Sequence, residues 1–200
     1  MTKMFVVFAP SGAGKTSLVR GLVAADATLA LSVSYTTRAK REGEKNGIDY
    51  MFISEDDFAS MRAANQFVEH AYVYGNWYGT GRERLESQLQ QGNTVLEVDW
   101  QGARQISQSM PQTVLIGIQP PTIAEVRARL KKRGKDCDQV IDKRMQTIGE
   151  EIRRLAMADY LVINDEFDLA LADLRAIVRS HSLEYQSMRQ QHQQLLAQLD

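Results

Sequence analysis

The 200-residue sequence has a single cysteine, no long apolar run and almost no net charge. One thiol, Cys137, cannot form an internal disulfide, which excludes a disulfide-stapled secreted domain, so we expect a reducing, cytoplasmic compartment. No stretch approaches the ~20 apolar residues that span a bilayer, and the apolar start is too short for a signal peptide, so we expect no membrane partner. The net charge of −1 excludes a uniformly basic nucleic-acid binder, and we expect no nucleic-acid partner.

Short apolar runs alternate with helical stretches along most of the chain. Apolar runs predict buried strands at residues 4–9, 31–35, 94–98, 113–118 and 160–163. Helical periodicity and capping residues predict helices at residues 16–25, 54–64, 82–91, 101–109, 122–133 and 140–155, with a final helix from residue 168 into the Gln-rich end. This alternation predicts an α/β fold, a parallel sheet flanked by helices.

Two segments do not fit the alternation. Residues 34–81 are rich in polar, aromatic and glycine residues, with a turn predicted at Gly75-Asn76. Residues 127–144 carry eight basic residues against three acidic ones. We interpret both as insertions that work over the carboxyl-terminal edge of the sheet.

The strongest motif is a phosphate-binding loop between the first strand and the first helix. It follows the pattern G-x-x-x-x-G-K-[ST] and consists of Ala9, Pro10, Ser11, Gly12, Ala13, Gly14, Lys15 and Thr16, followed by Ser17. Its backbone N–H groups can hold phosphates, Lys15 can neutralise their charge, and Thr16 can bind Mg²⁺. Ala9 replaces the first glycine of the pattern, which requires a negative φ there. The alternative, a glycine-rich turn without a ligand, is disfavoured because a strand and a helix flank the loop.

A second anion site is predicted in the polar loop after residue 33. Ser34, Arg38 and Arg41 lie in the run Ser-Tyr-Thr-Thr-Arg-x-x-Arg, and Tyr50 follows. Arginines three residues apart, beside hydroxyl donors, suit a second phosphate group held by paired hydrogen bonds. Two arginines in a polar loop are usually a solvated surface, but the phosphate-binding loop on the same chain favours binding.

Three carboxylates stand in or beside strand-like segments. Glu69 could accept two N–H bonds from one edge of a guanine base, and alone it fits a solvent-facing strand residue equally well. Glu97 and Asp99 lie at the end of the 94–98 strand, where acids of P-loop proteins help to position Mg²⁺ or substrate. Asp99 also fits a helix N-cap.

Three arginines lie in the basic segment: Arg129, Arg133 and Arg144. On a hinged helical segment, such side chains can close over transferring phosphates and stabilise their charge. Without a phosphate-binding loop on the chain, a solvated amphipathic face would be the better interpretation.

Together these segments resemble the guanylate kinase family, P-loop nucleoside-monophosphate kinases that transfer phosphate from ATP to GMP. The resemblance runs from Phe5 to about Arg179 and rests on PSGAGKT, SVSYTTR, NGIDYMF, FVEHAYVYGNWYGT, VDWQG, QPP, the RL…RG…KRM arginine series and VINDEFD. It implies a P-loop NTPase-type parallel sheet flanked by helices. The implied divisions are a core of about residues 1–33, 82–126 and 156–200, a GMP-binding insert of about residues 34–81 and a helical lid of about residues 127–155.

The resemblance also implies ligands and residue roles. ATP would lie on residues 9–17, with Arg133 and Asn164 near the adenine, and Mg²⁺ would be bound directly by Thr16 and through water by Glu97 and Asp99. The acceptor, GMP or dGMP, would have its base lined by Ser34, Glu69, Thr80 and Asp99 and its phosphate held by Arg38, Arg41, Tyr50 and Tyr78. The implied catalytic residues are Lys15, Arg38, Arg129, Arg133 and Arg144.

Two other functions remain open on the residues alone. A binding module with this fold would have lost the loop lysine and the arginines, all of which are present, and a phosphosugar kinase would not need Ser34 and Glu69. Relative to the family, Ala9 replaces a usual Gly, Glu42 a common Pro and Glu97 a frequent Asp, without loss of a needed charge or donor. A candidate homo-oligomer contact is the apolar stripe of the C-terminal helix, formed by Tyr185, Met188, Leu195 and Leu199.

Overall fold

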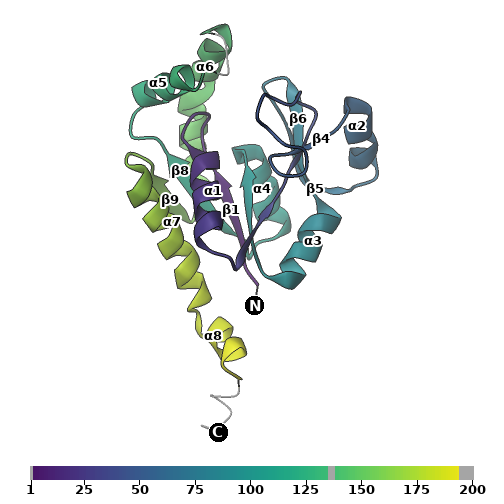
Figure 1. Ribbon diagram of the computed structural model, residues 1–200, viewed down its shortest axis with the longest axis vertical. Coiled ribbons are helices and arrows are strands. Elements are labelled where there is room, and N and C mark those ends of the chain that lie inside the picture. The colour runs from purple at the N-terminus through teal and green to yellow at the C-terminus, as the bar shows by residue number, and fades with distance from the viewer. Residues whose placement is uncertain (1, 135–137, 194–200) are drawn as a thin grey trace.

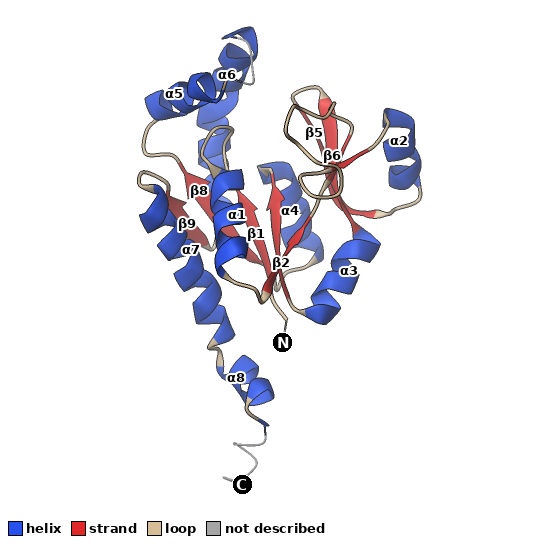
Figure 2. Ribbon diagram, in the orientation of Figure 1, coloured by secondary structure: helices blue, strands red, loops and turns tan. Residues whose placement is uncertain are grey.

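The main sheet has five strands: β1 (Met4–Phe8), β2 (Leu29–Ser32), β7 (Asn93–Val98), β8 (Val114–Gln119) and β9 (Tyr160–Ile163). The structure is a computed structural model that describes residues 2–134 and 138–193. The predicted residues that lie outside the described part are Cys137, Leu195, Leu199 and the side chain of Arg133. The strand order is β2-β7-β1-β8-β9, and every neighbouring pair is parallel (Figures 1 and 2). The predicted α/β class is confirmed, and the order places β1 at the centre of the sheet.

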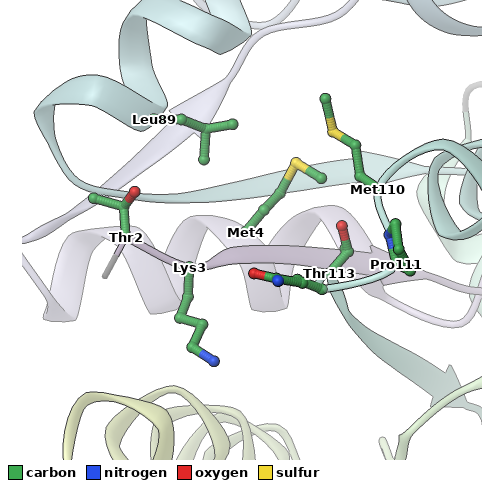
Figure 3. Close-up of a pocket in the computed structure, with 8 residues that line it drawn as sticks. Thr2, Lys3, Met4, Leu89, Met110, Pro111 and Thr113 are labelled. Atoms are coloured by element: carbon green, nitrogen blue, oxygen red, sulfur yellow. The ribbon is translucent and has the colours of Figure 1, made fainter. Parts of the chain in front are cut away.

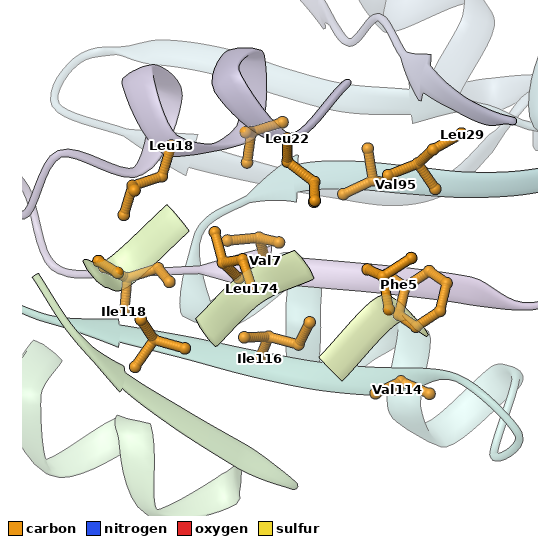
Figure 4. Packing of buried hydrophobic residues seen from close by; sticks show 14 of the residues in the cluster. Phe5, Val7, Leu18, Leu22, Leu29, Val95, Val114, Ile116, Ile118 and Leu174 are labelled. Carbon is orange, nitrogen blue, oxygen red and sulfur yellow. The ribbon is translucent and has the colours of Figure 1, made fainter. Parts of the chain in front are cut away.

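Helices cover both faces of the main sheet. The helices α1 (Lys15–Ala25) and α7 (Phe167–Ser182) pack on the face that carries Phe5 and Val7, as Figure 4 shows. The helices α3 (Arg82–Gln91) and α4 (Trp100–Ser109) pack on the other face, which carries Val6 and Phe8. Successive residues of a strand point to opposite faces, so a strand covered on both sides must be apolar throughout. The uninterrupted apolar run of β1 has this cause.

Residues 34–81 form a second, four-stranded sheet. Its strands are β3 (Tyr35–Thr36), β4 (Met51–Phe52), β5 (Phe67–Val73) and β6 (Asn76–Gly81), in the order β4-β3-β6-β5, with helix α2 (Glu55–Ala63) beside them. The strand expected at residues 31–35 is therefore wrong in extent, because β2 ends at Ser32 and Tyr35 belongs to the second sheet. The ring of Tyr35 packs closely over Gly81, since a Cβ on Gly81 would lie 2.7 Å from that ring. This close packing places Tyr35 in the second sheet.

The turn between β5 and β6 also differs from the expectation. Val73 pairs with Asn76, so the two turn residues are Tyr74 and Gly75 rather than Gly75 and Asn76. Both have positive φ, 48° for Tyr74 and 85° for Gly75. Two central residues with positive φ are the mark of a type I′ hairpin turn, whose twist suits the flanking strands.

The basic segment forms a helix pair, α5 (Ile123–Arg133) and α6 (Asp138–Arg154), followed by a short 3₁₀ turn, η1 (Leu155–Met157). Gly134, with φ of 64°, ends α5, which confirms the predicted helix break. The pair has a small apolar core of its own: Val126, Leu130, Ile141 and Ile148. In Figure 1 the helix pair and the second sheet stand at the same end of the main sheet.

The C-terminal helix is not continuous. Helix α7 ends at Ser182 and α8 (Tyr185–Gln191) begins after Glu184. The carboxylate of Glu184 lies 2.8 Å from Lys3 Nζ and 2.6 Å from His181 Nδ1, and these contacts hold the chain at the break. Within residues 2–134 and 138–193, no helix combines the length and the apolarity needed to cross a bilayer.

Candidate functional site

The phosphate-binding loop joins the carboxyl end of β1 to the amino end of α1. Gly12 and Gly14 have φ of 80° and 91°, values that glycine adopts without steric cost. The described non-glycine residues with positive φ are Asn65 and Tyr74, so Ala9 meets the condition set for it by the sequence. The loop therefore has the backbone of an anion-binding site at a helix N-terminus.

Asn164 braces this loop from the end of β9. Its side-chain Nδ2 donates a 2.7 Å hydrogen bond to the carbonyl of Ala13, and a Cβ on Gly14 would lie 2.3 Å from the same nitrogen. Arg129 Nη1 in turn donates to the backbone carbonyl of Asn164 at 3.0 Å. Asn164 was expected near an adenine base, and the structure places its buried amide on the phosphate-binding loop.

Lys15, Thr16 and Glu97 meet at one carboxylate oxygen. Lys15 Nζ lies 2.8 Å from Glu97 Oε1, and the Thr16 hydroxyl donates a hydrogen bond to the same atom. Burial disfavours the charged form of Glu97, but the charge and hydrogen bonds of Lys15 and Thr16 outweigh it and hold the pKa of Glu97 below its ordinary value. The groups expected to bind phosphate and metal are thus gathered at the carboxyl edge of the sheet.

The oxygens of this cluster are hard ligands of the kind that Mg²⁺ prefers. Among the residues that the structure describes, no group of three His, Cys, Asp or Glu side chains has the geometry of a metal site. A cation at Thr16 and Glu97 would therefore need further oxygens from a bound phosphate, which is how Mg²⁺ is usually held beside nucleotides.

A buried carboxylate lies between the second sheet and α4. Glu69 is 4% exposed, and its Oε1 accepts a 2.7 Å hydrogen bond from the Thr80 hydroxyl. Its Oε2 faces Gly102, where a Cβ would approach to 2.5 Å. Burial raises the pKa of Glu69 to about 7, and the nearby charge of Asp99 adds to the rise. Glu69 is thus not the solvent-facing residue that the pattern alone also allowed.

Asp99 is the N-cap of α4 and a neighbour of Glu69. Its Oδ1 accepts a 2.9 Å hydrogen bond from the backbone N–H of Gly102, so the capping role is present. Burial raises the pKa of Asp99 although the Gly102 bond opposes this rise. The cap fixes the Asp99 carboxylate at a place where its charge acts on Glu69.

Arg38 lies in a cluster of aromatic and acidic groups. Its Nη2 donates to both carboxylate oxygens of Glu44, at 2.8 and 3.0 Å, and its guanidinium lies 5.4 Å from the Tyr50 ring centroid. The Tyr50 and Tyr78 rings meet edge to face at 5.9 Å. Burial raises the pKa of Tyr50, so its hydroxyl remains a neutral donor. These groups can surround a doubly charged anion.

Two other predicted residues border this cluster. The backbone N–H of Arg41 donates to Glu44 Oε2 at 2.8 Å. The carbonyl of Ser34 accepts a 2.9 Å bond from the Met51 N–H, which ties the start of the insert to β4. Glu44 was not singled out in the sequence, since an acid in a polar loop carries no signal until its arginine partner is known.

Arg144 reaches the phosphate-binding loop from α6. Its Nη1 donates to the Ser11 hydroxyl at 3.2 Å. Glu151, further along the same helix, accepts a 2.9 Å bond from the Ser11 backbone N–H. No sequence pattern predicts a role for Glu151 either, because its partners lie 77 and 140 positions away along the chain. Two other predicted residues make no described contact in this cluster. The side chain of Arg133 lies outside the described part. Ser17 is exposed on α1.

A hollow of about 530 Å³ lies elsewhere, at the amino ends of β1 and β8 (Figure 3). Lys3, Met4, Met110 and Thr113 are among its lining residues, and none of the candidate site residues lines it. Ligands of open α/β sheets bind outside the carboxyl ends of the strands. The polar cluster at the carboxyl edge is therefore the better candidate.

The chain is similar to known proteins along nearly its whole length. The guanylate kinase family model matches residues 1–181. The guanylate kinase of Thiobacillus denitrificans is 47% identical over 190 residues, which are 94% of this chain and 91% of the relative. That of Bordetella pertussis is 46% identical over 197 residues, 98% of this chain and 92% of the relative. The solved guanylate kinase from Anaplasma phagocytophilum matches with a TM-score of 0.73 at 30% identity, covering 92% of this chain and 88% of that one.

Proposed function

The chain belongs to the guanylate kinase family, and from that premise we propose how its residues carry out the transfer of the γ-phosphoryl group of ATP to GMP. This reaction gives ADP and GDP. Phosphoryl transfer needs little covalent chemistry from the protein, so the residues act by placing two phosphates in line and by stabilising their charge. The proposal therefore assigns a donor site, an acceptor site and a set of cations between them.

The donor phosphates bind the loop of residues 9–16. The N–H groups of the loop and Lys15 hold the β- and γ-phosphates, and the hydrogen bond from Asn164 to Ala13 keeps the loop in shape for them. Thr16 and Glu97 would hold Mg²⁺, which would supply charge neutralisation at the donor phosphates. Lys15 moves from the carboxylate of Glu97 toward the phosphates, a shift that its flexible four-carbon stem permits.

The guanine base of the acceptor is recognised by Glu69, and this buried carboxylate is the observation that carries the proposal. Guanine presents N1–H and its exocyclic amine side by side, and a carboxylate accepts both. The Thr80 hydroxyl holds Glu69 through its hydrogen bond, Thr80 and Asp99 line the pocket, and Ser34 donates to O6. Adenine has an unprotonated N1 at this edge and would leave buried acceptors unpaired, which costs more than the loss of a contact.

The acceptor phosphate binds Arg38, Arg41, Tyr50 and Tyr78. The carboxylate of Glu44, which accepts two bonds from Arg38, holds the arginine in place. A phosphate beside it gains the remaining donors of the arginines and the two phenol hydroxyls. Paired arginine bonds fix the orientation of the acceptor oxygen as well as its charge.

Residues 127–155 act as a lid, and residues 34–81 as the acceptor insert. Arg129 and Arg144 already contact the donor loop through Asn164 and Ser11, and with Arg133 they supply cations to the transferring phosphoryl group. A lid that covers the phosphates also excludes water, which would otherwise compete with GMP as the acceptor.

A coupled ADP-release assay with MgATP tests the acceptor assignment directly. GMP and dGMP should both be good acceptors, since no residue of the proposed pocket is assigned to the ribose 2′-hydroxyl. AMP, UMP and ribose phosphates should be at least about 10³-fold poorer in kcat/KM, as for a site built to hydrogen-bond its substrate. Comparable rates with AMP would contradict the role of Glu69.

A further inference from the structure

Tyr74 occupies a backbone position that disfavours it. The type I′ turn from β5 to β6 has Tyr74 and Gly75 at its centre, with φ of 48° and 85°. Asn-Gly and Asp-Gly are the preferred pairs for this turn, and a bulky residue with positive φ costs of order 1–3 kcal/mol. Such strain persists only where other contacts hold the residue, so the Tyr74 side chain must be held by partners outside the turn.

Those partners lie on one face of α6. The Tyr74 hydroxyl donates a 2.6 Å hydrogen bond to Glu151 Oε1 and lies 3.5 Å from Thr147 Oγ1. The guanidinium of Arg144 stands over the phenol ring, 4.9 Å from its centroid. Burial, and then the bond to Glu151, raises the pKa of Tyr74 to about 12, so the hydroxyl remains a donor throughout the working pH range.

The same glutamate also holds the donor loop. Glu151 Oε2 accepts a 2.9 Å hydrogen bond from the backbone N–H of Ser11, while Oε1 accepts the Tyr74 hydroxyl and that of Thr147. Arg144 repeats this bridge, since it contacts both the Ser11 hydroxyl and the Tyr74 ring. One helix face thus joins the donor loop to the tip of the hairpin formed by β5 and β6.

That hairpin carries acceptor residues. Glu69 lies on β5, and Tyr78 and Thr80 lie on β6. The contacts of Tyr74 therefore affect the position of the two strands that carry these acceptor residues. Neither Tyr74 nor Glu151 is assigned a contact with a substrate. Their contacts instead fix where the acceptor insert stands relative to the donor loop.

We propose that Tyr74 and Glu151 are a positioning pair that couples acceptor binding to donor binding. This inference rests on the assignment of GMP to the insert and of ATP to the loop. An acceptor that orders the hairpin stabilises the contact of the Tyr74 hydroxyl with Glu151, and Glu151 then holds Ser11 in the arrangement that receives the donor phosphates. By linkage, the donor must favour the acceptor by the same factor.

Calorimetry on the whole chain measures this factor. A non-hydrolysable ATP analogue is titrated with Mg²⁺ into the protein, with and without saturating GMP. We expect GMP to tighten binding of the analogue by about tenfold, within the usual range of coupling between sites. An equal affinity with and without GMP in the wild-type protein would overturn the proposal.

Tyr74→Phe removes the hydroxyl and keeps the ring beneath Arg144. We expect this variant to lose most of the tenfold factor while it binds GMP alone within about twofold of wild type. Tyr72→Phe is the matched control, because Tyr72 lies on the same strand, is 55% exposed and packs only against Trp77 among the described ring contacts. The control should keep the full factor, and an equal loss in both variants would overturn the proposal.

Two further variants separate positioning from simple stabilisation. Tyr74→Asn restores the residue that the turn prefers, so its melting temperature should be at least that of Tyr74→Phe while the coupling stays lost. Tyr74→Phe combined with Glu151→Gln should lose no more coupling than the more affected single variant, because both changes remove one interaction. Additive losses, or a lower melting temperature with intact coupling, would show a structural role instead. If wild-type protein fails to bind GMP, the acceptor assignment fails, which is distinct from GMP binding without coupling.

Discussion

Lys15 Nζ lies 2.8 Å from Glu97 Oε1, although the two residues are 82 positions apart in the sequence. The lysine that we assign to the donor phosphates is therefore held by a carboxylate at the end of β7. Glu97 is 15% exposed at its side chain, so each charge is largely withdrawn from water and compensates the other. On the proposed function, bound phosphates would compete with this carboxylate for Lys15, and Glu97 would then be available as a metal ligand.

Lys15→Met should reduce kcat by about 10²–10³-fold or more, because one central cation stabilises the charge of the transition state. The measurement is steady-state turnover at saturating MgATP and GMP. The variant should remain folded, as shown by an unchanged far-UV spectrum. Near-normal kcat would contradict the assignment of the loop to the donor.

Arg38→Ala should weaken binding of the acceptor and leave the donor unaffected. The loss of a charge-assisted bond costs about 1.5–3 kcal/mol, so KM for GMP should rise roughly 10- to 150-fold. KM for ATP should stay within about twofold. The control is Arg84→Ala, since Arg84 is exposed on α3. A rise confined to the KM for ATP would show that the two phosphate sites are assigned the wrong way round.

Glu69→Gln should lower kcat/KM for GMP by at least about tenfold, which is ~1.4 kcal/mol. The amide keeps one acceptor but sets an NH₂ group against a guanine donor. Glu86→Gln, an exposed change on α3, should have no effect because surface ion pairs contribute little. The proposal would be falsified by a Glu69→Gln enzyme that keeps full efficiency and full preference for GMP over AMP.

The pH dependence should report the same carboxylate. Burial raises the pKa of Glu69 to about 7, and guanine needs the ionised form, so kcat/KM for GMP should rise with pH through about 7 and level off above it. A residual enzyme activity measured in Glu69→Gln should lack this step. If the wild-type profile and the variant profile have the same shape, the step belongs to another group.

The raised pKa also predicts a cost in stability. Between the ordinary value of 4.5 and about 7, the folded chain binds the Glu69 proton more tightly than the unfolded chain does. The free energy of unfolding therefore falls as the pH rises through this window. Glu69→Gln should melt at a higher temperature than wild type at pH 8, and the difference should shrink toward pH 5. Differential scanning calorimetry at the two pH values measures both quantities.

Gly14→Ala should damage the donor loop more than Gly43→Ala damages its own turn. Both residues have positive φ, 91° and 81°, so both variants pay about 1–2 kcal/mol for the backbone alone. A Cβ at Gly14 would also lie 2.3 Å from Asn164 Nδ2, whereas nothing lies within 4 Å of one at Gly43. Thermal melting should show the larger loss for Gly14→Ala, together with a raised KM for ATP. Equal losses would mean that Asn164 moves aside freely.

Several parts of the site were predictable because they are contiguous in the chain. The loop from Ala9 to Thr16 is recognisable since the spacing of its glycines, lysine and threonine sets the local backbone. The helix break at Gly134 follows equally from local chemistry, since glycine adopts the left-handed conformation at low cost. The turn was expected at Gly75-Asn76 because both residues favour turns, but Val73 pairs with Asn76, and Tyr74 in the turn is held by contacts with α6.

The sequence by itself determined the alternation of strands and helices, the phosphate-binding loop and the residue types available for catalysis, because periodicity and short motifs are properties of neighbouring residues. Only the tertiary structure decided the strand order, the pairing of Lys15 with Glu97, the brace from Asn164 to Ala13 and the bridge from Glu151 to Ser11. These contacts join residues 82 to 151 positions apart. At such separations the partner of a polar group is chosen by how the sheet and its helices pack, and no local pattern encodes that choice.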